Sequence, residues 1–257
     1  MDRIFNIYKE AGWTSFDVVA KMRGILKIKK IGHTGTLDPM ATGVLPVCVG
    51  KATKRVEEVA GKDKEYKAVM LLGTVTDTQD MTGTVLSENP ELKVLPEFAG
   101  AMQLSEFSGT KQLPEFAGTM PMPEDKQKRE AAVRGAVNSF IGEYDQLTPM
   151  FSARKVNGKK LVDLARKGIE VERKTKHISI YDIKIEEINF PRITMLITCS
   201  KGTYIRTLCH DIGVKLGCGA CMESLLRTRV GEFRLEDSIT LAQLQELADS
   251  GAFNDEN

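Results

Sequence analysis

The chain has 257 residues, which is enough for one large domain or two small ones and for a substantial apolar core. Hydrophobic residues make up 42% and charged residues 28%, as is typical of water-soluble globular proteins, and the sequence contains neither a signal-peptide pattern nor an apolar run of about twenty residues. We therefore expect a cytoplasmic protein that is neither secreted nor membrane-spanning, and five cysteines, an odd number, argue against a disulfide framework.

The N-terminal part of the chain predicts a strand over residues 3–8 and a helix over residues 14–26. Thr14 or Ser15 is the expected N-cap of this helix, and an aspartate in the first turn favours its start. The side chains expected to face the core are Phe16, Val19 and Ala20.

Further strands are predicted over residues 66–73, 178–188 and 192–199. In the last of these, apolar residues alternate with more polar ones, as a half-buried strand requires. They are Ile193, Met195, Ile197 and Cys199. In the second strand the apolar parity shifts between Ile180 and Ile183, which indicates a bulge or a bend.

Helical spacing covers residues 129–142, 203–217 and 240–251. The apolar stripe of the first helix consists of Ala132, Val133, Ala136, Val137, Phe140 and Ile141. The stripe of the second consists of Ile205, Leu208, Ile212 and Leu216. The third helix opens with a Thr240–Gln243 capping box. Because strands and helices mix without a regular β-α-β repeat, the expected fold class is α+β (mixed α/β) rather than doubly wound.

An internal repeat occupies residues 95–121. Its three near-copies, "LPEFAGAMQ", "LSEFSGTKQ" and "LPEFAGTMP", keep leucine, glutamate, phenylalanine and glycine at fixed offsets. Three units are too few for a solenoid, and the proline and glycine disfavour long helices. We interpret the segment 92–123 as an exposed insertion that arose by local duplication.

Charge is distributed unevenly although the net charge is only +1. Residues 154–176 contain nine basic and three acidic residues, whereas residues 232–257 contain seven acidic residues and one arginine. Such a basic stretch is either a binding surface for a polyanion such as nucleic acid or a solvated helix face.

The stretch "GHTGTLDPMATG", residues 32–43, admits three interpretations. It matches neither GxxxxGK[ST] nor GxGxxG, which disfavours a phosphate-binding loop. It can be a glycine-rich turn in which Asp38 and Pro39 simply bend the chain. Alternatively, the glycines let a bulky ligand approach the backbone, and Pro39 stiffens a loop that presents the Asp38 carboxylate as a nucleophile or general base.

Three other stretches carry candidate functional groups. In "CSKGTYIRTL", residues 199–208, Tyr204 and Arg206 stand at the predicted helix start. Arg206 can either pair with a partly buried carboxylate and keep it ionised, or form an ordinary surface ion pair. Tyr66 begins a strand behind a charged run, and residues 151–168 concentrate basic side chains around a glycine.

Together these stretches resemble one family, the bacterial tRNA pseudouridine-55 synthases (the TruB family of pseudouridine synthases). "GHTGTLDPMATGVLPVCVGKATK" is similar to the family's catalytic motif. Four further motifs follow in the family's order: "DKEYKA…LGTVTDTQDMTG", "FSARKVNG…LARKG", "CSKGTYIRTLCHDIG" and "LGCGACMESLLRTRVGEF". The resemblance covers about residues 3–86 and 126–245.

The resemblance implies a pseudouridine-synthase fold with a large mixed, mostly antiparallel sheet flanked by helices. It also implies conversion of the T-loop uridine of tRNA (position 55) to pseudouridine without cofactor or metal. Asp38 matches the family's catalytic aspartate, Arg206 its ion-pair partner, and Tyr66 the tyrosine that stacks on the target base. Tyr204 matches a second active-site tyrosine, and His33 a histidine implicated in extruding the nucleotide. The sequence leaves open whether Asp38 attacks C1′, adds to the base or removes the C2′ proton, and we favour a role at the sugar.

Residues 145–176 align with the family's RNA-gripping thumb. The predicted substrate contacts are His33, Gly35, Thr36, Leu37, Lys54, Lys64, Arg154, Lys155, Lys159, Lys201 and Leu225, with Lys51, Arg55 and Lys62 as further phosphate contacts. The expected partner is tRNA, bound through its T-arm stem-loop by a monomer that needs neither a protein partner nor a membrane. Residues 1–250 are expected to form one catalytic domain that includes the thumb and the 92–123 insertion, followed by a tail at 251–257 and no C-terminal RNA-binding domain.

The chain departs from the family pattern at Glu10, Thr148 and Phe151, where proline, proline and tyrosine are usual, and at Cys221, where histidine is common. Cys218 and Cys221 form a CxxC pair, but a zinc site is disfavoured because no second pair exists. The insertion is a passive loop, an extra RNA-binding edge or a partner site. Two alternative functions, an inactive tRNA-folding chaperone and a nucleotide-binding transferase, are disfavoured by the complete residue set and by the missing phosphate-loop pattern.

Overall fold

A computed structural model describes residues 1–89, 93–94, 120–121 and 125–253. The chain forms two compact units, which we describe separately. Unit 1 comprises Met1–Lys67, Thr198–Lys201 and Leu225–Asn257, and unit 2 comprises Ala68–Ile197 and Gly202–Ser224. The strands β4 (Lys64–Leu72), β13 (Arg192–Cys199) and β14 (Ala220–Val230) contribute residues to both.

Unit 1 is built around strand β3 (Thr42–Val49), of which seven of eight residues are buried. β3 pairs antiparallel with β1 (Ile4–Lys9) and β2 (Ile31–His33), and parallel with β14, where Leu226 lies opposite Thr42. The short β15 (Phe233–Arg234) pairs antiparallel with the end of β14. The sheet is therefore mixed and mostly antiparallel in these pairings, as predicted.

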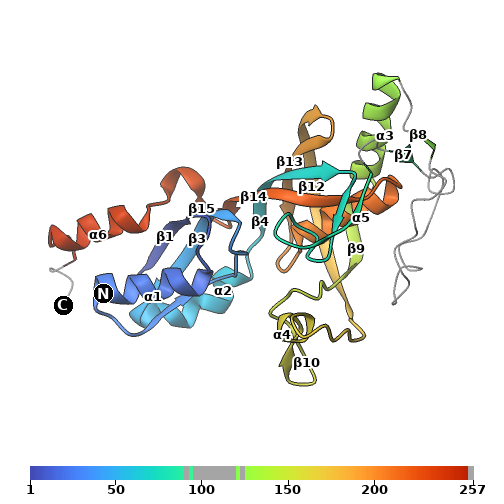
Figure 1. Ribbon diagram of the computed structural model, residues 1–257. Coiled ribbons are helices and arrows are strands. Elements are labelled where there is room, and N and C mark those ends of the chain that lie inside the picture. Colours follow the sequence, from blue (N-terminus) through green and yellow to red (C-terminus); the bar gives the residue numbers. More distant parts are fainter. Residues whose placement is uncertain (90–92, 95–119, 122–124, 254–257) are drawn as a thin grey trace. The chain divides into compact units, whose positions relative to one another are not determined.

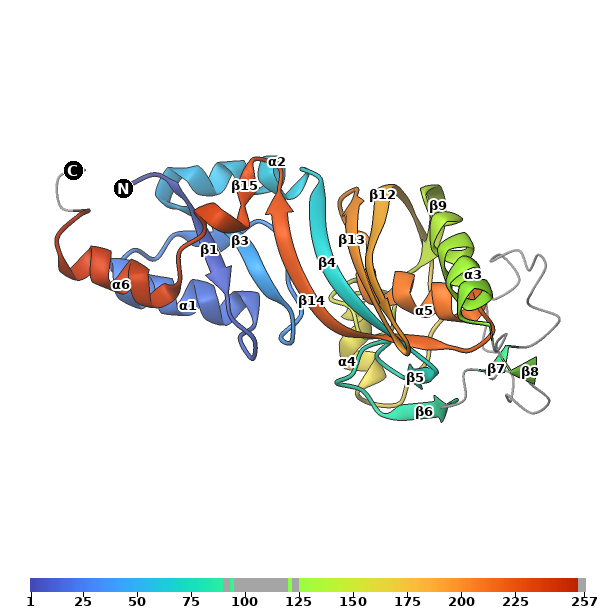
Figure 2. The same ribbon diagram turned by 90° about the horizontal axis from the view of Figure 1, so that it is seen from above.

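The helices of unit 1 are α1 (Ser15–Leu26), α2 (Val56–Ala60) and α6 (Leu241–Asp249), with 3₁₀ turns η1 (Gly50–Arg55) and η4 (Leu235–Asp237). α1 and α6 lie side by side (Figures 1 and 2). Apolar side chains of α1 and of strands β1 to β3 form one core cluster, which α6 joins through Leu244. This packing places the N-terminus of α1 beside the loop between β2 and β3.

Helix α1 starts as predicted but turns a different face inward. Thr14 is the N-cap and makes a reciprocal capping box with Asp17. The prediction that Phe16 and Ala20 face the core is wrong: Phe16 is 64% exposed and Ala20 is exposed. With Thr14 as the cap, the buried stripe at helical spacing runs through Ser15, Val18, Val19, Met22 and Ile25.

Unit 2 contains a sheet with the strand order β4-β13-β12-β9, in which β12 spans Thr175–Asn189 and β9 spans Gly142–Leu147. Helices α3 (Lys126–Asn138) and α5 (Ile205–Lys215) lie against β12 and β9 (Figure 2). The remaining elements of the described residues are α4 (Leu161–Ala165) and three two-stranded sheets. They are β5 (Thr74–Thr76) with β6 (Val85–Glu88), β7 (Lys93–Val94) with β8 (Met120–Pro121), and β10 (Lys155–Val156) with β11 (Lys159–Lys160).

Most predicted elements of unit 2 are confirmed. The alternating residues of β13 and the stripe of α5 are buried, and burial along β12 shifts parity between Ile180 and Ile183. On the α3 segment the predicted stripe is too wide, because Ala132 is exposed and Ile141 is 42% exposed beyond the helix end at Asn138. In unit 1, the predicted capping box of α6 is confirmed as well.

The three nonapeptides lie outside the described residues, except for the two residues of β8 at the end of the third. Among the described helices, none combines the length and apolar character that crossing a bilayer demands.

Candidate active site

The loop "GHTGTLDPMATG" connects β2 to β3 in unit 1 and carries Asp38 half-buried near its middle. The Asp38 carbonyl accepts a hydrogen bond from the Ala41 amide at 3.0 Å, which closes a tight turn. The Pro39 carbonyl accepts one from the Gly12 amide at 2.9 Å. The turn interpretation and the carboxylate-presenting interpretation are therefore compatible, because the turn fixes the backbone that carries the carboxylate.

The first residue of α1 anchors this loop. The Leu37 amide donates to Ser15 Oγ at 2.9 Å, and both residues are almost fully buried. The start of α1, set by the Thr14 capping box, thus determines where the residue before Asp38 lies. The backbone of Leu37 thus anchors the loop, and its side chain is only 3% exposed. The expected contact of Leu37 with substrate stays a prediction.

Arg227 on β14 is a central residue of the site that sequence reasoning missed. It is 1% exposed; its Nε donates to the Val44 carbonyl at 2.7 Å and its Nη2 to the Gly35 carbonyl at 3.3 Å. Its positive charge also acts on the phenol of Tyr66 and favours a lower pKa for that group. The sequence indicates this role only by placing an arginine within the strand "SLLRTRV". A guanidinium that is buried in a strand requires several hydrogen-bond acceptors around it.

Gly43, at the end of the loop, permits the close approach of β3 to β14. Its φ is +103°, and a Cβ at this position would lie 2.3 Å from the Arg227 carbonyl oxygen. The last glycine of the stretch is therefore required by strand packing. The interpretation that this glycine admits a ligand is not needed to explain it.

Tyr66 and His33 of unit 1 are held neutral. Burial raises the pKa of Tyr66, which is 8% exposed, and Arg227 opposes this rise without cancelling it. Burial lowers the pKa of His33, and the nearby Arg227 lowers it further. Near neutral pH both rings are therefore uncharged, which suits contact with an uncharged base.

Lys9 is a second buried cation that sequence reasoning did not assign to the site. Its ammonium donates to the carbonyls of Glu10, Trp13 and Pro39 at 3.0, 2.7 and 3.2 Å. Burial lowers the pKa of Lys9 to about 8, and the attraction of the Asp38 carboxylate limits that fall. The lysine therefore connects the Asp38 loop to the segment between β1 and α1, and it places positive charge within electrostatic reach of Asp38.

In unit 2, Arg206 is 6% exposed and fixed at the start of α5. Its Nη2 donates to the Phe151 carbonyl at 2.6 Å, and its Nη1 to Asp80 Oδ2 at 3.3 Å. Asp80 is 2% exposed, and its Oδ1 accepts from the hydroxyls of Thr78 and Thr82. Because Phe151 acts through its backbone here, replacing the family's tyrosine with phenylalanine leaves this contact intact.

Tyr204 is the N-cap residue of α5, and Gln146 on β9 positions its backbone. The Tyr204 amide donates to Gln146 Oε1 at 2.8 Å, and Gln146 Nε2 donates to the Tyr204 carbonyl at 3.0 Å. Gln146 is 1% exposed and is another residue that sequence reasoning missed. Asp38 and Arg206 belong to different units, and the expected ion pair between them stays a prediction.

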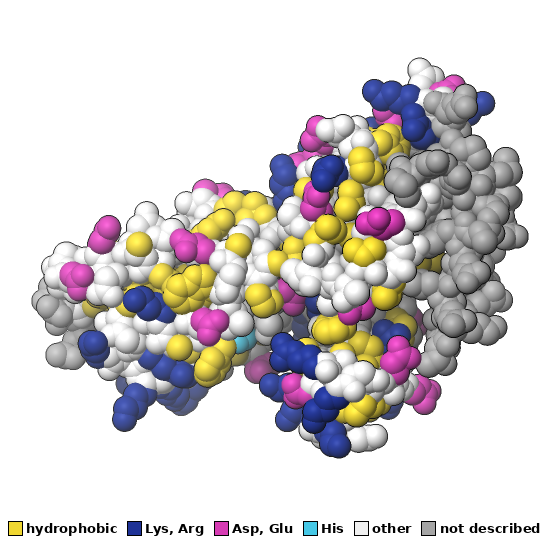
Figure 3. All heavy atoms as spheres, viewed as in Figure 1, with side chains coloured by type: hydrophobic (Ala, Val, Ile, Leu, Met, Phe, Trp, Pro, Cys, Tyr) yellow, Lys and Arg dark blue, Asp and Glu magenta, His cyan; other side chains and the backbone are white. Residues whose placement is uncertain are grey.

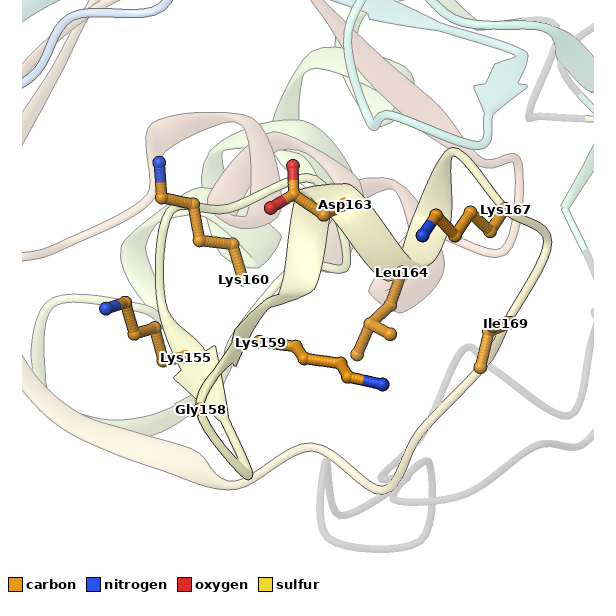
Figure 4. A pocket seen from close by; sticks show the side chains of 8 residues that line it. All are labelled: Lys155, Gly158, Lys159, Lys160, Asp163, Leu164, Lys167 and Ile169. Carbon is orange, nitrogen blue, oxygen red and sulfur yellow. The ribbon is translucent and has the colours of Figure 1, made fainter.

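The basic segment forms the hairpin β10–β11 and helix α4 around a shallow hollow of about 440 Å³. Lys155, Lys159, Lys160 and Lys167 line it together with Asp163, and Leu164 and Ile169 form its apolar part. Figure 4 shows the ammonium ends of Lys159 and Lys167 on either side of Leu164. Lysine and arginine side chains gather over this part of the surface (Figure 3). Arg154, just before the hairpin, is exposed and donates to Thr148 Oγ1 at 3.0 Å.

The other predicted substrate contacts differ in their surroundings. The Lys64 side chain is buried and its ammonium donates to the carbonyls of Ala60 and Lys62, both at 2.6 Å, so it caps the end of α2. The exposed cations are Lys51, Lys54, Arg55 and Lys201, of which Lys51 pairs with Asp2 and Arg55 with Glu58. Lys62 is half-buried, Thr36 is exposed and Leu225 is 8% exposed. These substrate contacts stay predictions.

All five cysteines are buried and free. Burial raises the pKa of Cys218 to about 12 and that of Cys221 to about 11, and Cys221 Sγ lies 3.4 Å from Met81 Sδ. In the described part of the chain, no three His, Cys, Asp or Glu side chains are grouped as a metal site.

Comparison with known proteins places the sequence motifs and this geometry in one family. Residues 23–117 and 116–205 match the family model described as "TruB family pseudouridylate synthase (N terminal domain)". The chain belongs to the TruB family. Residues 206–256, beginning within α5 at Arg206, match "tRNA pseudouridylate synthase B C-terminal domain".

Curated TruB-family relatives are similar along nearly the whole chain. The tRNA pseudouridine synthase B of Clostridium tetani is 45% identical over 246 residues, which cover 96% of this chain and 73% of that protein. The protein of the same name from Clostridium acetobutylicum is 46% identical with the same coverage.

Solved structures share the fold. A Cbf5-Nop10-Gar1 complex matches with a TM-score of 0.63 and 30% identity, and the archaeal box H/ACA sRNP Nop10-Cbf5 complex with 0.61 and 26%. Each match covers 98% of this chain and 55% of the other, so the chain spans about half the length of those proteins. The α+β fold class predicted from the sequence agrees with these neighbours.

Proposed function

We propose that this chain converts the T-loop uridine of tRNA, position 55, to pseudouridine. The observation that carries the proposal is the loop with Asp38, which Lys9, Ser15 and Arg227 hold rigidly beside the buried phenol of Tyr66. The names of the TruB-family relatives in Clostridium support tRNA as the substrate.

The reaction breaks the N1–C1′ bond, turns the uracil and forms a C5–C1′ bond, so the atoms balance when C5 loses a proton and N1 gains one. No oxidant, reductant or cofactor is needed for this balance. Asp38 is proposed to act at the sugar, either as a nucleophile at C1′ or as the base that removes the C2′ proton. The neutral Tyr66 ring is proposed to stack on the flipped base, which offsets roughly 1–3 kcal/mol of the flipping cost.

Arg206 is proposed to pair with the Asp38 carboxylate and keep it ionised. The fixed position of Arg206 supports this role, because its guanidinium donates hydrogen bonds to Asp80 and to the Phe151 carbonyl. Tyr204 and His33 are proposed to complete the site, with the neutral His33 ring helping to displace the nucleotide.

RNA binding is proposed to rest on the thumb, residues 145–176, and on exposed cations of η1. The lysines that line the hollow, together with Arg154, supply phosphate contacts. We further propose that the enzyme acts in the cytoplasm as a monomer without cofactor, and that residues 1–250 work as one catalytic domain.

The test measures tritium release from an unmodified T-arm stem-loop labelled at uracil C5. Wild type should release tritium and form pseudouridine, whereas Asp38→Asn should be slower by more than about 10³-fold because a reacting group is lost. Asp182→Asn, an exposed carboxylate on β12, is the matched control and should react like wild type.

Two outcomes would contradict the proposal. Binding of the stem-loop without tritium release by wild type would favour the inactive RNA chaperone. Equal release by wild type and Asp38→Asn would remove Asp38 from the mechanism.

A further inference from the structure

A second basic surface lies in unit 1, whereas the thumb belongs to unit 2. Between Asp17 and Asp38 the sequence contains no acidic residue but five basic ones. They are Lys21, Arg23, Lys27, Lys29 and Lys30. The four lysines are exposed and Arg23 is half-buried. Among the described residues, none of the five forms an ion pair with a carboxylate, so their charge is uncompensated at close range.

The surface continues onto the 3₁₀ turn η1. The Gly50 amide donates to the Lys30 carbonyl at 2.8 Å, which joins the segment before β2 to the turn that carries Lys51 and Lys54. Both of these lysines are exposed. Figure 3 shows lysine and arginine side chains gathered along this part of unit 1, near α1 and the η1–α2 segment. We call the set of Lys21, Arg23, Lys27, Lys29, Lys30, Lys51 and Lys54 the α1 basic surface.

An exposed aromatic ring borders the α1 basic surface. Phe16 is 64% exposed, and the Arg23 guanidinium lies 5.9 Å from the centre of its ring. A ring next to uncompensated cations suits nucleic acid, whose backbone is anionic and whose bases stack on aromatic faces. The cations outnumber this single apolar ring, so the surface does not resemble an apolar protein interface.

Helix α1 links this surface to the Asp38 loop. Ser15 at its first turn anchors Leu37, whereas the basic residues occupy its second half and the segment that follows. The helix has 12 residues and is therefore about 18 Å long, the length of several base-pair steps of an RNA stem. An RNA that presents one nucleotide to Asp38 can thus place phosphates of its flanking stem on the α1 basic surface.

We infer that the α1 basic surface binds the phosphate backbone of the substrate tRNA outside the T-loop. This inference rests on the proposed function, and it adds a second binding surface to the thumb. Basic residues near a helix C-terminus also stabilise the helix dipole. This structural role explains Arg23 and Lys27 but not the other residues of the α1 basic surface. Lys21, Lys29 and Lys30 lie outside that last turn.

The experiment therefore compares Lys21→Gln/Lys29→Gln/Lys30→Gln with wild type on full-length tRNA and on a short T-arm hairpin. The matched control removes three cations from α3 with Lys126→Gln/Lys128→Gln/Arg134→Gln. Glutamine removes the charge and keeps part of the aliphatic stem, and thermal melting confirms that each variant is folded. Tritium release gives KM and kcat at several salt concentrations.

For the α1 variant we expect the KM for full-length tRNA to rise about tenfold, with kcat unchanged and a shallower dependence of log KM on log salt. The KM for the hairpin, whose short stem can cover only part of the surface, should rise by a smaller factor, and the α3 control should match wild type. An unchanged KM and salt slope on full-length tRNA would overturn the inference while leaving the proposed function intact. Absence of tritium release by wild type would instead contradict the proposed function.

Discussion

At the scale of single residues, the site depends on buried polar side chains that form hydrogen bonds with backbone groups or with other buried side chains. Arg227 donates to the carbonyls of Gly35 and Val44, and its charge acts on the phenol of Tyr66. In the other unit, Asp80 and Gln146 perform comparable tasks for Arg206 and Tyr204. A buried group with several fixed partners has one low-energy geometry, so these residues hold the groups that are proposed to react.

Replacing Arg227 with methionine should leave the Gly35 and Val44 carbonyls without a donor. Each buried unsatisfied acceptor costs about 1–3 kcal/mol, so the free energy of unfolding should fall measurably in urea titrations. A shift of about 1 Å in the Asp38 loop should lower kcat about 100-fold while the KM for RNA changes little. Arg227→Lys should restore part of kcat, because it keeps the charge but not the fork of donors.

Arg229 on the same strand provides the control for this prediction. It is half-buried and makes a long hydrogen bond of 3.4 Å to the Gly231 carbonyl. Arg229→Met should therefore have near-normal kcat and stability. Equal effects of the two substitutions would contradict the positioning role of Arg227.

At the scale of secondary-structure elements, two contacts determine where the reactive loop sits. Helix α1 contributes the Ser15 anchor, and the parallel pairing of β3 with β14 sets Gly43 against the backbone of Arg227. The glycine has no Cβ and adopts a positive φ, so it meets both requirements of this contact.

Gly43→Ala should destabilise the fold, because its Cβ would lie 2.3 Å from a backbone oxygen that cannot move independently. We expect a loss of more than about 2 kcal/mol, measured by urea unfolding. Gly24→Ala in α1 is the matched control, since nothing lies within 4 Å of its Cβ position. That substitution should stabilise the helix by about 0.5–1 kcal/mol. A stable Gly43→Ala protein would show that β3 and β14 tolerate separation.

Asp211 in helix α5 makes the stability of the folded protein depend on pH. Burial raises the pKa of this carboxyl from 3.8 to about 7, and it has no hydrogen-bond or ion-pair partner among the described residues. The folded state therefore binds more protons than the unfolded state between about pH 4 and 7, so this group makes stability fall as pH rises through that window.

Asp211→Asn should remove this dependence. Above pH 7 the variant should be more stable than wild type by about 1–3 kcal/mol, less than the full shift implies because the side chain is partly exposed. Below pH 4 the two proteins should have similar melting temperatures. Parallel melting curves across the whole range would contradict the raised pKa.

At the scale of the whole molecule, the net charge is near zero although basic and acidic residues are concentrated in different parts of the sequence. The net charge is +1, yet residues 154–176 and residues 18–37 are both strongly basic while the region from 232 onward is acidic. RNA binding responds to such local concentrations of cations rather than to net charge.

Turnover at low RNA concentration should therefore fall steeply with salt. In Lys155→Gln/Lys159→Gln the slope of log(kcat/KM) against log salt should be smaller in magnitude by up to about 2, because up to two phosphate contacts are lost. The control is Lys128→Gln/Lys184→Gln, which removes two exposed lysines from α3 and β12. A salt-insensitive wild type would contradict phosphate binding by the thumb.

Much of this protein follows from local sequence. The capping box at Thr240, the alternation of β13 and the stripe of α5 depend on neighbours within four residues, and all were predicted correctly. The N-cap of α1 was predicted as Thr14 or Ser15, and it is Thr14. Long motifs in a fixed order were also sufficient to indicate the family, and with it Asp38 as the candidate catalytic residue.

Tertiary structure decided what lies opposite each side chain. The sequence did not predict that Arg227 would reach Gly35, that Gln146 would hold Tyr204, or that Lys64 would cap α2. The inward face of α1 was also wrong at Phe16, because apolar spacing alone cannot tell which stripe has a partner. The first two are contacts between residues far apart in the chain, and local spacing carries no information about the partner that folding brings to them.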